Sequence, residues 1–215
     1  MKIRSVCFDM DGTLIRNTNS VRYLCELNGN LDALEEIEAL ENRGKISWIE
    51  ADHLKAPLIE GLALASVESE FGRRIELIQN IEPVLAYLKA RRMSSVLITA
   101  GPIQVANVLA TEFDFDAAYG SEYEVRGTRF TGQMTNHLGN GGKLKCLRAF
   151  AEKHGIPLEN CVAIGDSESD IEVFEACGRS IAINCSDAAA EVASVCIITE
   201  DIADILEILE SWLSE

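Results

Sequence analysis

Hydrophobic and polar positions divide the chain into three parts with different periods. Residues 4–8 form an apolar run of strand length, and a glycine-containing turn follows it. Residues 19–77 carry apolar positions at helical spacing, so we expect about four short helices there and no strand. From about residue 78 onward, apolar runs of strand length alternate with runs of helix length.

The alternation in the last part predicts a parallel sheet with helices on both faces, which is an α/β fold. One segment departs from it: residues 122–134 alternate around Arg126 and Gly127, which predicts a β-hairpin. The predicted strands are residues 94–99, 115–120, 161–164, 180–184 and 195–198, and the predicted helices are residues 82–92, 102–112, 142–154, 169–177, a short one from 187, and 202–213.

Composition narrows the range of partners. With 215 residues, of which 47% are hydrophobic, the chain can bury a full-sized core. Its net charge of −16 argues against nucleic acid and anionic membrane surfaces as partners, because both require basic patches. An anionic substrate must then be attracted locally, by a metal ion or a few well-placed cations. We expect the acidic residues of the helical part, Glu35, Glu36, Glu38 and Glu41, to form a solvated face.

Cysteine usage and the lack of targeting segments indicate the compartment. The seven cysteines are scattered, with neither C-x-x-C nor Cys/His metal spacing, as is typical of small buried residues in a reducing environment. No apolar run reaches about 18 residues, and the N-terminus enters a strand directly without a signal peptide. We therefore expect a cytoplasmic protein, and the sequence leaves open whether it is a monomer or a homodimer.

Two acidic residues, Asp9 and Asp11, follow the first predicted strand, and Gly12 and Thr13 come next. Side chains two residues apart on an extended segment project from the same face. Two carboxylates held that close repel each other unless a cation or a proton lies between them. Asp and Gly are also ordinary turn residues, so a solvated turn is the alternative, and three later segments decide between the two.

The three later segments place polar residues at the ends of predicted strands and at a helix start. They are Thr99-Ala100-Gly101-Pro102, Lys143 after two glycines, and Asp166 with Asp170. Ligands of parallel α/β sheets bind beyond the carboxyl ends of the strands. We therefore expect these segments and Asp9 to converge on one crevice.

The convergent residues suit phosphoryl transfer, where catalysis is mostly positioning and charge stabilisation. Asp9 is predicted to attack phosphorus and form an aspartyl-phosphate, and Asp11 to act as acid and then as base. Thr99 and Lys143 are predicted to hold the phosphate with the small residues Ala100 and Gly101. Several carboxylates in one place require a hard divalent cation, so we expect Mg²⁺, with Asp9, Asp11, Asp166 and Asp170 as its ligands and a main-chain carbonyl of Met10 or Asp11 beside them.

Taken together, four motifs of this sequence resemble those of the haloacid-dehalogenase-like phosphatases. They are Phe8-Asp-Met-Asp-Gly-Thr-Leu14, Ile98-Thr99, Lys143 and Gly165-Asp-x-x-x-Asp170, in order and at suitable spacing. The resemblance implies a Rossmann-like three-layer core, residues 1–16 and 78–215, with a small helical cap domain, residues 17–77, inserted after the first strand. It also implies a phosphatase that acts on a small phosphorylated metabolite.

Within that family the segment from Lys143 to Ile205 and the hairpin around Gly127 are most similar to the phosphoserine phosphatases. The resemblance then implies substrate-binding roles for Lys55, at the place of a cap arginine, and for Ser169, at the place of an asparagine. The sequence departs from the pattern where Thr99-Ala100-Gly101 replaces Ser-Gly-Gly. It also lacks an early cap glutamate, near whose place Thr18 and Asn19 stand. These departures leave the specificity for phosphoserine open.

Two alternatives remain at this point. A phosphomutase of the same family shares all four motifs and is distinguished only by its product. A receiver-type signalling domain also combines an acidic pair with Thr or Ser, Lys and Mg²⁺. However, its phosphorylated Asp normally follows a middle strand of a domain of about 100–150 residues, whereas Asp9 follows the first strand.

Overall fold

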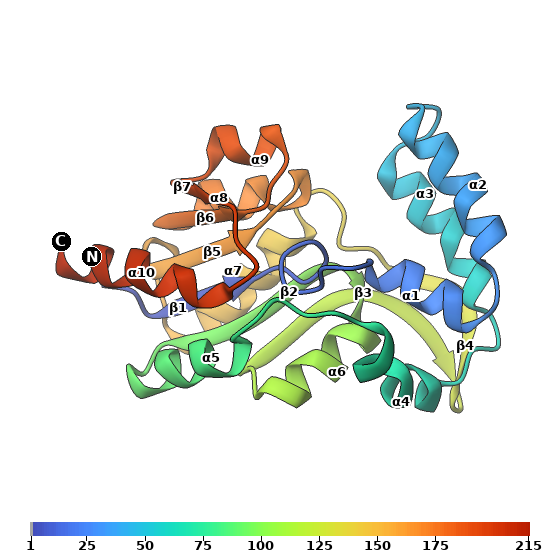
Figure 1. Cartoon of the computed structure of the whole chain (residues 1–215), viewed down its shortest axis with the longest axis horizontal. Helices are drawn as coiled ribbons and strands as arrows, with labels where there is room; N and C mark the ends of the chain where they lie inside the picture. Colours follow the sequence, from blue (N-terminus) through green and yellow to red (C-terminus); the bar gives the residue numbers. More distant parts are fainter. Residues whose placement is uncertain (1) are drawn as a thin grey trace.

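The computed structural model describes residues 2–215, and its centre is one seven-stranded sheet (Figure 1). The strand order is β4-β3-β2-β1-β5-β6-β7, so the first strand of the chain lies in the middle. All neighbours pair in parallel except β3 and β4, which form an antiparallel hairpin. The strands are β1 (Ser5–Phe8), β2 (Ser94–Pro102), β3 (Ala117–Arg126), β4 (Arg129–Asn136), β5 (Cys161–Gly165), β6 (Arg179–Ile183) and β7 (Val195–Ile197).

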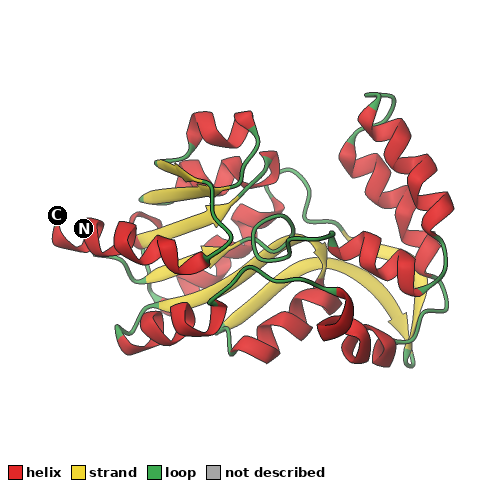
Figure 2. Ribbon diagram, in the orientation of Figure 1, coloured by secondary structure: helices red, strands yellow, loops and turns green. Residues whose placement is uncertain are grey.

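Helices cover both faces of the sheet and make a three-layer α/β core (Figure 2). The α-helices of residues 78–215 are α5 (Ile81–Ala90), α6 (Ile103–Phe113), α7 (Gly142–His154), α8 (Ile171–Ala176), α9 (Asp187–Val192) and α10 (Ile205–Ser214). Short 3₁₀ turns η2 (Leu158–Asn160), η3 (Glu168–Asp170) and η4 (Ile202–Asp204) join them.

Alternation along the buried strands explains why the core has two halves. Val6 and Phe8 of β1 belong to the hydrophobic cluster that includes side chains of α5, α6 and α10, whereas Cys7 belongs to the cluster formed with α7 and α8. Successive side chains of a strand point to opposite faces. A strand that is apolar at every position is therefore buried on both sides, as expected for a central parallel strand.

The predicted elements are found with small shifts in their ends. The helix predicted at residues 142–154 is α7, with the same bounds. The strand predicted at 115–120 and the first arm of the predicted hairpin are one continuous strand, β3. Strand β2 runs on past Thr99 to Pro102, with an irregular register against β3. The helix predicted at 169–177 starts as the 3₁₀ turn η3.

Residues 19–77 form helices, as predicted. They are α1 (Ser20–Leu27), α2 (Leu31–Asn42), α3 (Trp48–Lys55), the 3₁₀ turn η1 (Ala56–Ile59) and α4 (Leu64–Arg74). Helix α3 begins with a capping box, in which Ser47 and Glu50 satisfy each other's main-chain N–H groups.

The helical segment is attached to the core in two different ways. Helices α2 and α3 project from the body as a pair (Figure 1). By contrast, Tyr23 of α1 and Phe71 of α4 belong to the same hydrophobic cluster as the strands, and the hairpin tip is hydrogen-bonded to the segment after η1. The division into a core domain and a cap domain at residues 17 and 77 stays a prediction, because one continuous apolar cluster crosses it.

Tyr23 offers a test of this attachment. Its hydroxyl, fully buried, donates to the main-chain carbonyl of Val67 at 2.7 Å and so joins α1 to α4. We expect Tyr23→Phe to lower the free energy of unfolding by about 1–2 kcal/mol, because the carbonyl of Val67 is left without its donor. Tyr87→Phe, whose hydroxyl bonds at the surface to Glu210, is the control and should change stability by less than about 0.5 kcal/mol. Urea unfolding of both variants measures the difference, and equal losses would contradict it.

Candidate active site

The predicted site residues meet at the carboxyl ends of three adjacent strands, β2, β1 and β5. Asp9 directly follows β1, Thr99 lies in the last part of β2, and Asp166 directly follows β5. Lys143 reaches the same place from the first turn of α7. Four segments that lie far apart in the sequence therefore converge because parallel strands end at one edge.

Lys143 lies at the centre of the site and is buried with its partners. Its Nζ lies 2.5 Å from Asp9 Oδ1 and 2.8 Å from Asp170 Oδ1, and all three side chains are at most 5% exposed. Burial disfavours the charge of Lys143, but the carboxylates of Asp170 and Asp9 outweigh this effect and raise its pKa. The lysine therefore stays positive and fixes the orientation of Asp9.

Asp170 is held from both sides. Its second oxygen, Oδ2, accepts the main-chain N–H groups of Asp166 and Ser167, each at 3.2 Å. Asp170 is the last residue of a capping box that Ser167 opens at η3. A local turn signal in the sequence thus positions the carboxylate that anchors Lys143.

Asp9, Asp166 and Asp170 could together hold a metal ion. One carboxylate oxygen of each lies within 4.8 Å of the others. Burial raises the pKa of Asp166 to about 6, and the charge of Asp170 adds to this effect. Three ionised carboxylates beside one lysine leave two negative charges unbalanced, and all the donors are hard oxygens. This donor set fits Mg²⁺, which prefers oxygen ligands and a double charge to neutralise.

Asp11 occupies a different environment from Asp9. Its Oδ1 accepts the main-chain N–H of Ser20 at 2.7 Å, and its Oδ2 accepts the Ser20 hydroxyl at 2.5 Å. Burial raises the pKa of Asp11 to about 6, although the bonds from Ser20 work against the shift. The Asp11 side chain is thus turned away from the three-carboxylate group, toward the start of α1. A carboxyl with a pKa near neutrality can both give and take a proton.

Ser20 was not among the residues selected from the sequence. It is fully buried and is the first residue of α1, directly after the helix cap Asn19. The sequence feature that could have indicated Ser20 is its position, since it is a hydroxyl residue at the start of the first helix after the Asp9–Asp11 motif. Which way that helix faces depends on tertiary packing, so the sequence alone did not indicate the bond to Asp11.

Two glycines are required by close approach around these carboxylates. Gly12 has a positive φ of 84°, and a Cβ there would collide with the Asp166 carboxylate. A Cβ on Gly101 would collide with the Ser20 hydroxyl and would lie 2.7 Å from Asp11 Oδ2. Glycine at both positions therefore keeps space for the acidic side chains.

The segment after Ile98 differs in detail from the expected strand-to-helix turn. It continues as strand, and α6 begins only at Ile103, with Pro102 as its cap. The hydroxyl of buried Thr99 accepts the main-chain N–H of Gly101 at 2.9 Å, and the Ala100 carbonyl accepts the hydroxyl of Ser121 at 2.6 Å. The bond from Ser121 joins this segment to β3, and the bond to Thr99 lies within the segment itself. Together they extend the strand and bring Ala100 and Gly101 beside Asp11.

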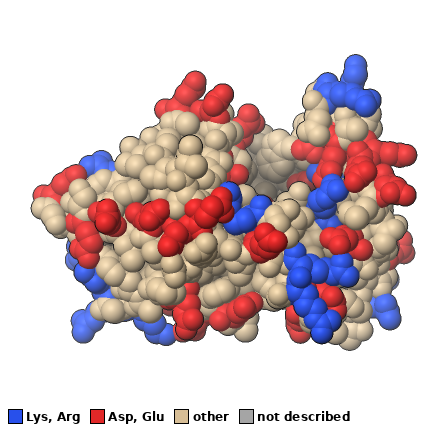
Figure 3. All heavy atoms as spheres, in the orientation of Figure 1, with Lys and Arg blue, Asp and Glu red and all other residues tan. Residues whose placement is uncertain are grey.

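A cavity of about 520 Å³ opens between this edge of the sheet and the α2–α3 pair. Figure 3 shows the surface hollowed between the core and that pair, with acidic side chains beside the hollow on the projecting pair. The residues that line the cavity are Asp11, Asn19, Val21, Glu41, Trp48, Asp52, Lys55, Ala100, Gly101, Ser167, Glu168, Ser169 and Ser186. Both residues predicted to bind substrate through the cap and the last motif, Lys55 and Ser169, are among them.

The surroundings of Lys55 correct one expectation. Its ammonium lies 2.9 Å from Glu41 and 3.4 Å from Asp52, and its side chain is 10% exposed. Glu41 therefore does not belong to a solvated face, because α2 turns it toward α3 and the cavity. Glu35 and Glu36 are exposed, as expected, although Glu35 bonds to Arg22 of α1. Glu38 is half-buried and also bonds to Arg22, so it differs from the expectation.

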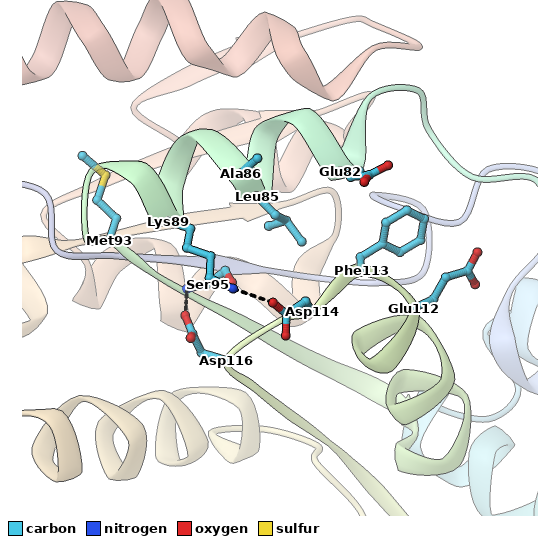
Figure 4. Close-up of a pocket in the computed structure, with 10 residues that line it drawn as sticks. All are labelled: Glu82, Leu85, Ala86, Lys89, Met93, Ser95, Glu112, Phe113, Asp114 and Asp116. Carbon is cyan, nitrogen blue, oxygen red and sulfur yellow. Dashed lines mark hydrogen bonds and ion pairs between the residues drawn. The ribbon is translucent and has the colours of Figure 1, made fainter.

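A second cavity, of about 260 Å³, lies at the opposite end of the strands, between α5 and α6. Figure 4 shows Lys89 paired with Asp114, and the carboxylate of Asp116 accepting the main-chain N–H of Ser95. These charged groups already have partners within the chain. The cavity shares no residue with the site at the carboxyl ends.

The fold and the acidic site together define a class. The family of haloacid dehalogenase-like hydrolases matches residues 6–175, and the chain belongs to this family. Among curated proteins, it is similar to the phosphoserine phosphatase of Methanocaldococcus jannaschii, with 25% identity over 210 residues that cover 97% of this chain and 99% of the relative. A solved structure described as a substrate-bound phosphoserine phosphatase complex aligns with a TM-score of 0.83 and 25% identity, and covers 97% of this chain and 99% of that one.

Other relatives are longer than this chain. The phosphoserine phosphatase of Streptomyces coelicolor is 28% identical over 195 residues, which are 90% of this chain and 47% of the relative. The chain likewise spans 60% of the Archaeoglobus fulgidus phosphoserine phosphatase. Across residues 2–215, none of the helices has both the length and the apolar character needed to cross a membrane.

The carboxylate group predicts that Mg²⁺ stabilises the chain in a pH-dependent way. Because the pKa of Asp166 is raised to about 6, the folded metal-free chain holds a proton there that the unfolded chain has lost above about pH 4. The stability that the bound proton contributes is lost as pH rises through 6. Above that pH Asp166 is ionised, so Mg²⁺ binds without displacing a proton. At about one hundred times its Kd, Mg²⁺ should raise Tm by roughly 5–10 °C at pH 7.5, and by less at pH 5.

Thermal unfolding with and without Mg²⁺ tests this expectation. Asp166→Asn should remove most of the Mg²⁺-induced shift at pH 7.5, whereas Glu152→Gln, on the exposed face of α7, should keep it. A shift that is equal at the two pH values, or that Asp166→Asn leaves intact, would contradict the assignment.

Proposed function

We propose that this protein is a Mg²⁺-dependent phosphomonoester hydrolase that acts through an aspartyl-phosphate on Asp9. The single observation that carries the proposal is the pairing of Asp9 with Lys143 beside Asp166, while Asp11 lies apart on Ser20. One carboxylate is thereby oriented for attack, and the other is free of the lysine and has a pKa near neutrality. Family membership adds support, since the relatives named above are phosphatases.

In the first step, an Asp9 carboxylate oxygen forms a bond to phosphorus as the bond from phosphorus to the leaving oxygen breaks. Lys143 holds Asp9 in position through one carboxylate oxygen, which leaves the second available for attack. The positive charge of Lys143 also balances charge that develops on the phosphoryl oxygens. The hydroxyl of Thr99 supplies a further polar contact at the end of β2.

Asp11 transfers the protons. In its neutral form it gives a proton to the leaving oxygen, and the product alcohol departs through the cavity. As a carboxylate it then takes a proton from a water molecule that attacks phosphorus, and the bond to Asp9 breaks to release inorganic phosphate. Ser20 positions Asp11 for both transfers by binding both of its oxygens.

Asp9 and Asp166 are the residues best suited to hold Mg²⁺, with a main-chain carbonyl of the Asp9–Asp11 segment. Asp170 also belongs to the acidic group, but both of its oxygens accept hydrogen bonds, one of them from Lys143. When bound, Mg²⁺ supplies charge stabilisation of the phosphoryl oxygens and lowers the repulsion between them and the carboxylates.

The substrate is proposed to be a small phosphorylated metabolite. The cavity is of the size that holds small ligands. Phosphoserine is the candidate that the names of the relatives suggest. The family assignment favours a hydrolase over a receiver-type signalling domain. A phosphomutase is distinguished by its product, because a hydrolase releases inorganic phosphate.

Replacement of the nucleophile tests the proposal directly. Wild-type protein should release phosphate from para-nitrophenyl phosphate with Mg²⁺, and Asp9→Asn should lower kcat by at least about 10³-fold because an amide does not attack phosphorus. The matched control is Asp116→Asn at the opposite end of the strands, which should stay active. Full activity of Asp9→Asn, or of wild type in excess chelator, would refute the proposal.

The role of Asp11 predicts a different defect. Asp11→Asn should form the aspartyl-phosphate slowly from an aryl phosphate, whose leaving group needs little protonation, but hydrolyse it poorly because no base activates water. Rapid-quench trapping of labelled protein should therefore detect phosphoenzyme while steady-state turnover falls by about 10²-fold or more. Normal turnover by Asp11→Asn would remove Asp11 from the acid and base role.

A further inference from the structure

The far end of the active-site cavity decides which leaving group can bind. Asp11, Ala100 and Gly101 line the end beside the reacting carboxylates, and Glu41, Trp48, Asp52 and Lys55 line the end formed by α2 and α3. A phosphate at the end lined by Asp11, Ala100 and Gly101 leaves the rest of the substrate to extend toward α2 and α3. The charges on these two helices therefore act on the leaving group.

Lys55 does not offer a free positive charge to a substrate. It is the only Lys or Arg among the described residues that line the cavity, and its ammonium bonds to both Glu41 and Asp52. Burial lowers its pKa, but the bond to Glu41 and the charge of Asp52 outweigh burial and raise it. The single cation is thus shared between two carboxylates of the chain, which leaves this wall negative.

His137 does not change this balance in favour of a substrate anion. Its Nε2 lies 3.0 Å from Asp52 Oδ2, and its side chain is 7% exposed. Asp52 therefore contacts both His137 and Lys55, and neither side chain is free for a substrate carboxylate.

A substrate carboxylate would therefore have to displace a carboxylate of the chain. Displacing Glu41 from Lys55 leaves Glu41, whose side chain is 28% exposed, without its partner in a partly buried place. It also brings a third negative group beside Asp52. Two further acids, Asp11 and Glu168, line the same cavity and add to the repulsion.

An ammonium group meets the opposite conditions. The carboxylates of Glu41 and Asp52 attract it, and the indole of Trp48 supplies an aromatic surface of the kind that binds cations. Trp48 is held in place by packing against His137, with ring centroids 5.2 Å apart. The three groups lie on two packed helices that form one wall of the cavity.

We propose that this enzyme selects phosphomonoesters whose leaving group carries an ammonium group and no carboxylate, through Glu41, Asp52 and Trp48. The proposal rests on the phosphatase activity proposed above. Lys55 then acts as a positioning residue that holds the two carboxylates side by side, in place of a ligand for the carboxylate of phosphoserine.

Three substrates that differ by one group each provide the test. Phosphoethanolamine carries the ammonium alone, phosphoserine adds a carboxylate, and ethyl phosphate lacks both. We expect kcat/KM for phosphoethanolamine to exceed each of the other two at least about tenfold, because like charges across a partly buried contact are costly. A kcat/KM for phosphoserine or ethyl phosphate that equals or exceeds that for phosphoethanolamine would overturn the inference.

A variant assigns the selectivity to the wall. Glu41→Gln frees the ammonium of Lys55 from one carboxylate, so the preference for phosphoethanolamine over phosphoserine should fall about tenfold, mainly through a lower KM for phosphoserine. The control is Glu38→Gln on the same helix, which removes a carboxylate that bonds to Arg22 and should keep the preference. An unchanged preference in Glu41→Gln, or an equal loss in Glu38→Gln, would overturn the assignment.

The test of substrate selectivity can fail while the proposed phosphatase activity holds. Hydrolysis of para-nitrophenyl phosphate that depends on Asp9 establishes the activity without reference to the leaving group. If that activity is present and phosphoethanolamine is not the preferred alkyl substrate, only the inference on selectivity is wrong. If that activity is absent, the proposed function fails and the selectivity proposal fails with it.

Discussion

The buried contact of Lys143 with Asp9 and Asp170 is the interaction on which the rest of the site depends. A lysine enclosed to this degree keeps its charge only beside carboxylates, and the carboxylates tolerate burial only beside the lysine. Each member comes from a different part of the chain: the end of β1, the start of α7 and the turn after β5. The contact therefore ties these three segments together, in addition to the apolar packing of the sheet. Exchange of Lys143 for a neutral residue would leave two buried carboxylates without a positive partner.

The sequence was sufficient for the residues that follow directly from strand topology. Asp9, Thr99 and Asp166 each lie at the end of a strand, and parallel pairing alone carries them to one edge. Lys143 could also be predicted from the sequence, because two glycines mark the start of its helix. A strand-and-helix pattern thus carries three-dimensional information wherever the position along an element also determines the position in space.

The sequence was insufficient where a side chain's partner depends on how helices pack. The orientation of α1 decides that Ser20 faces Asp11, and the orientation of α2 against α3 decides that Glu41 faces Lys55. Helical spacing identifies which residues share a face, but it does not say what that face contacts. The acidic residues of α2 were predicted to form one solvated face for this reason. Glu35 and Glu36 are exposed, but Glu41 faces the cavity and half-buried Glu38 bonds to Arg22. Contacts of this kind line the cavity, so its lining was harder to predict from the sequence than the residues at the strand ends.

The bond from Ser20 to Asp11 has a consequence for modularity. The helical segment of residues 17–77 is not a cover that can be exchanged freely, because Ser20, the first residue of α1, bonds to both carboxylate oxygens of Asp11. Gly101 of β2 leaves just enough space for that contact. A chimera that took its cap from a relative would therefore need a matching hydroxyl residue at the start of α1 and a glycine opposite it. The junction that must be inherited together runs through Asp11, Ser20 and Gly101.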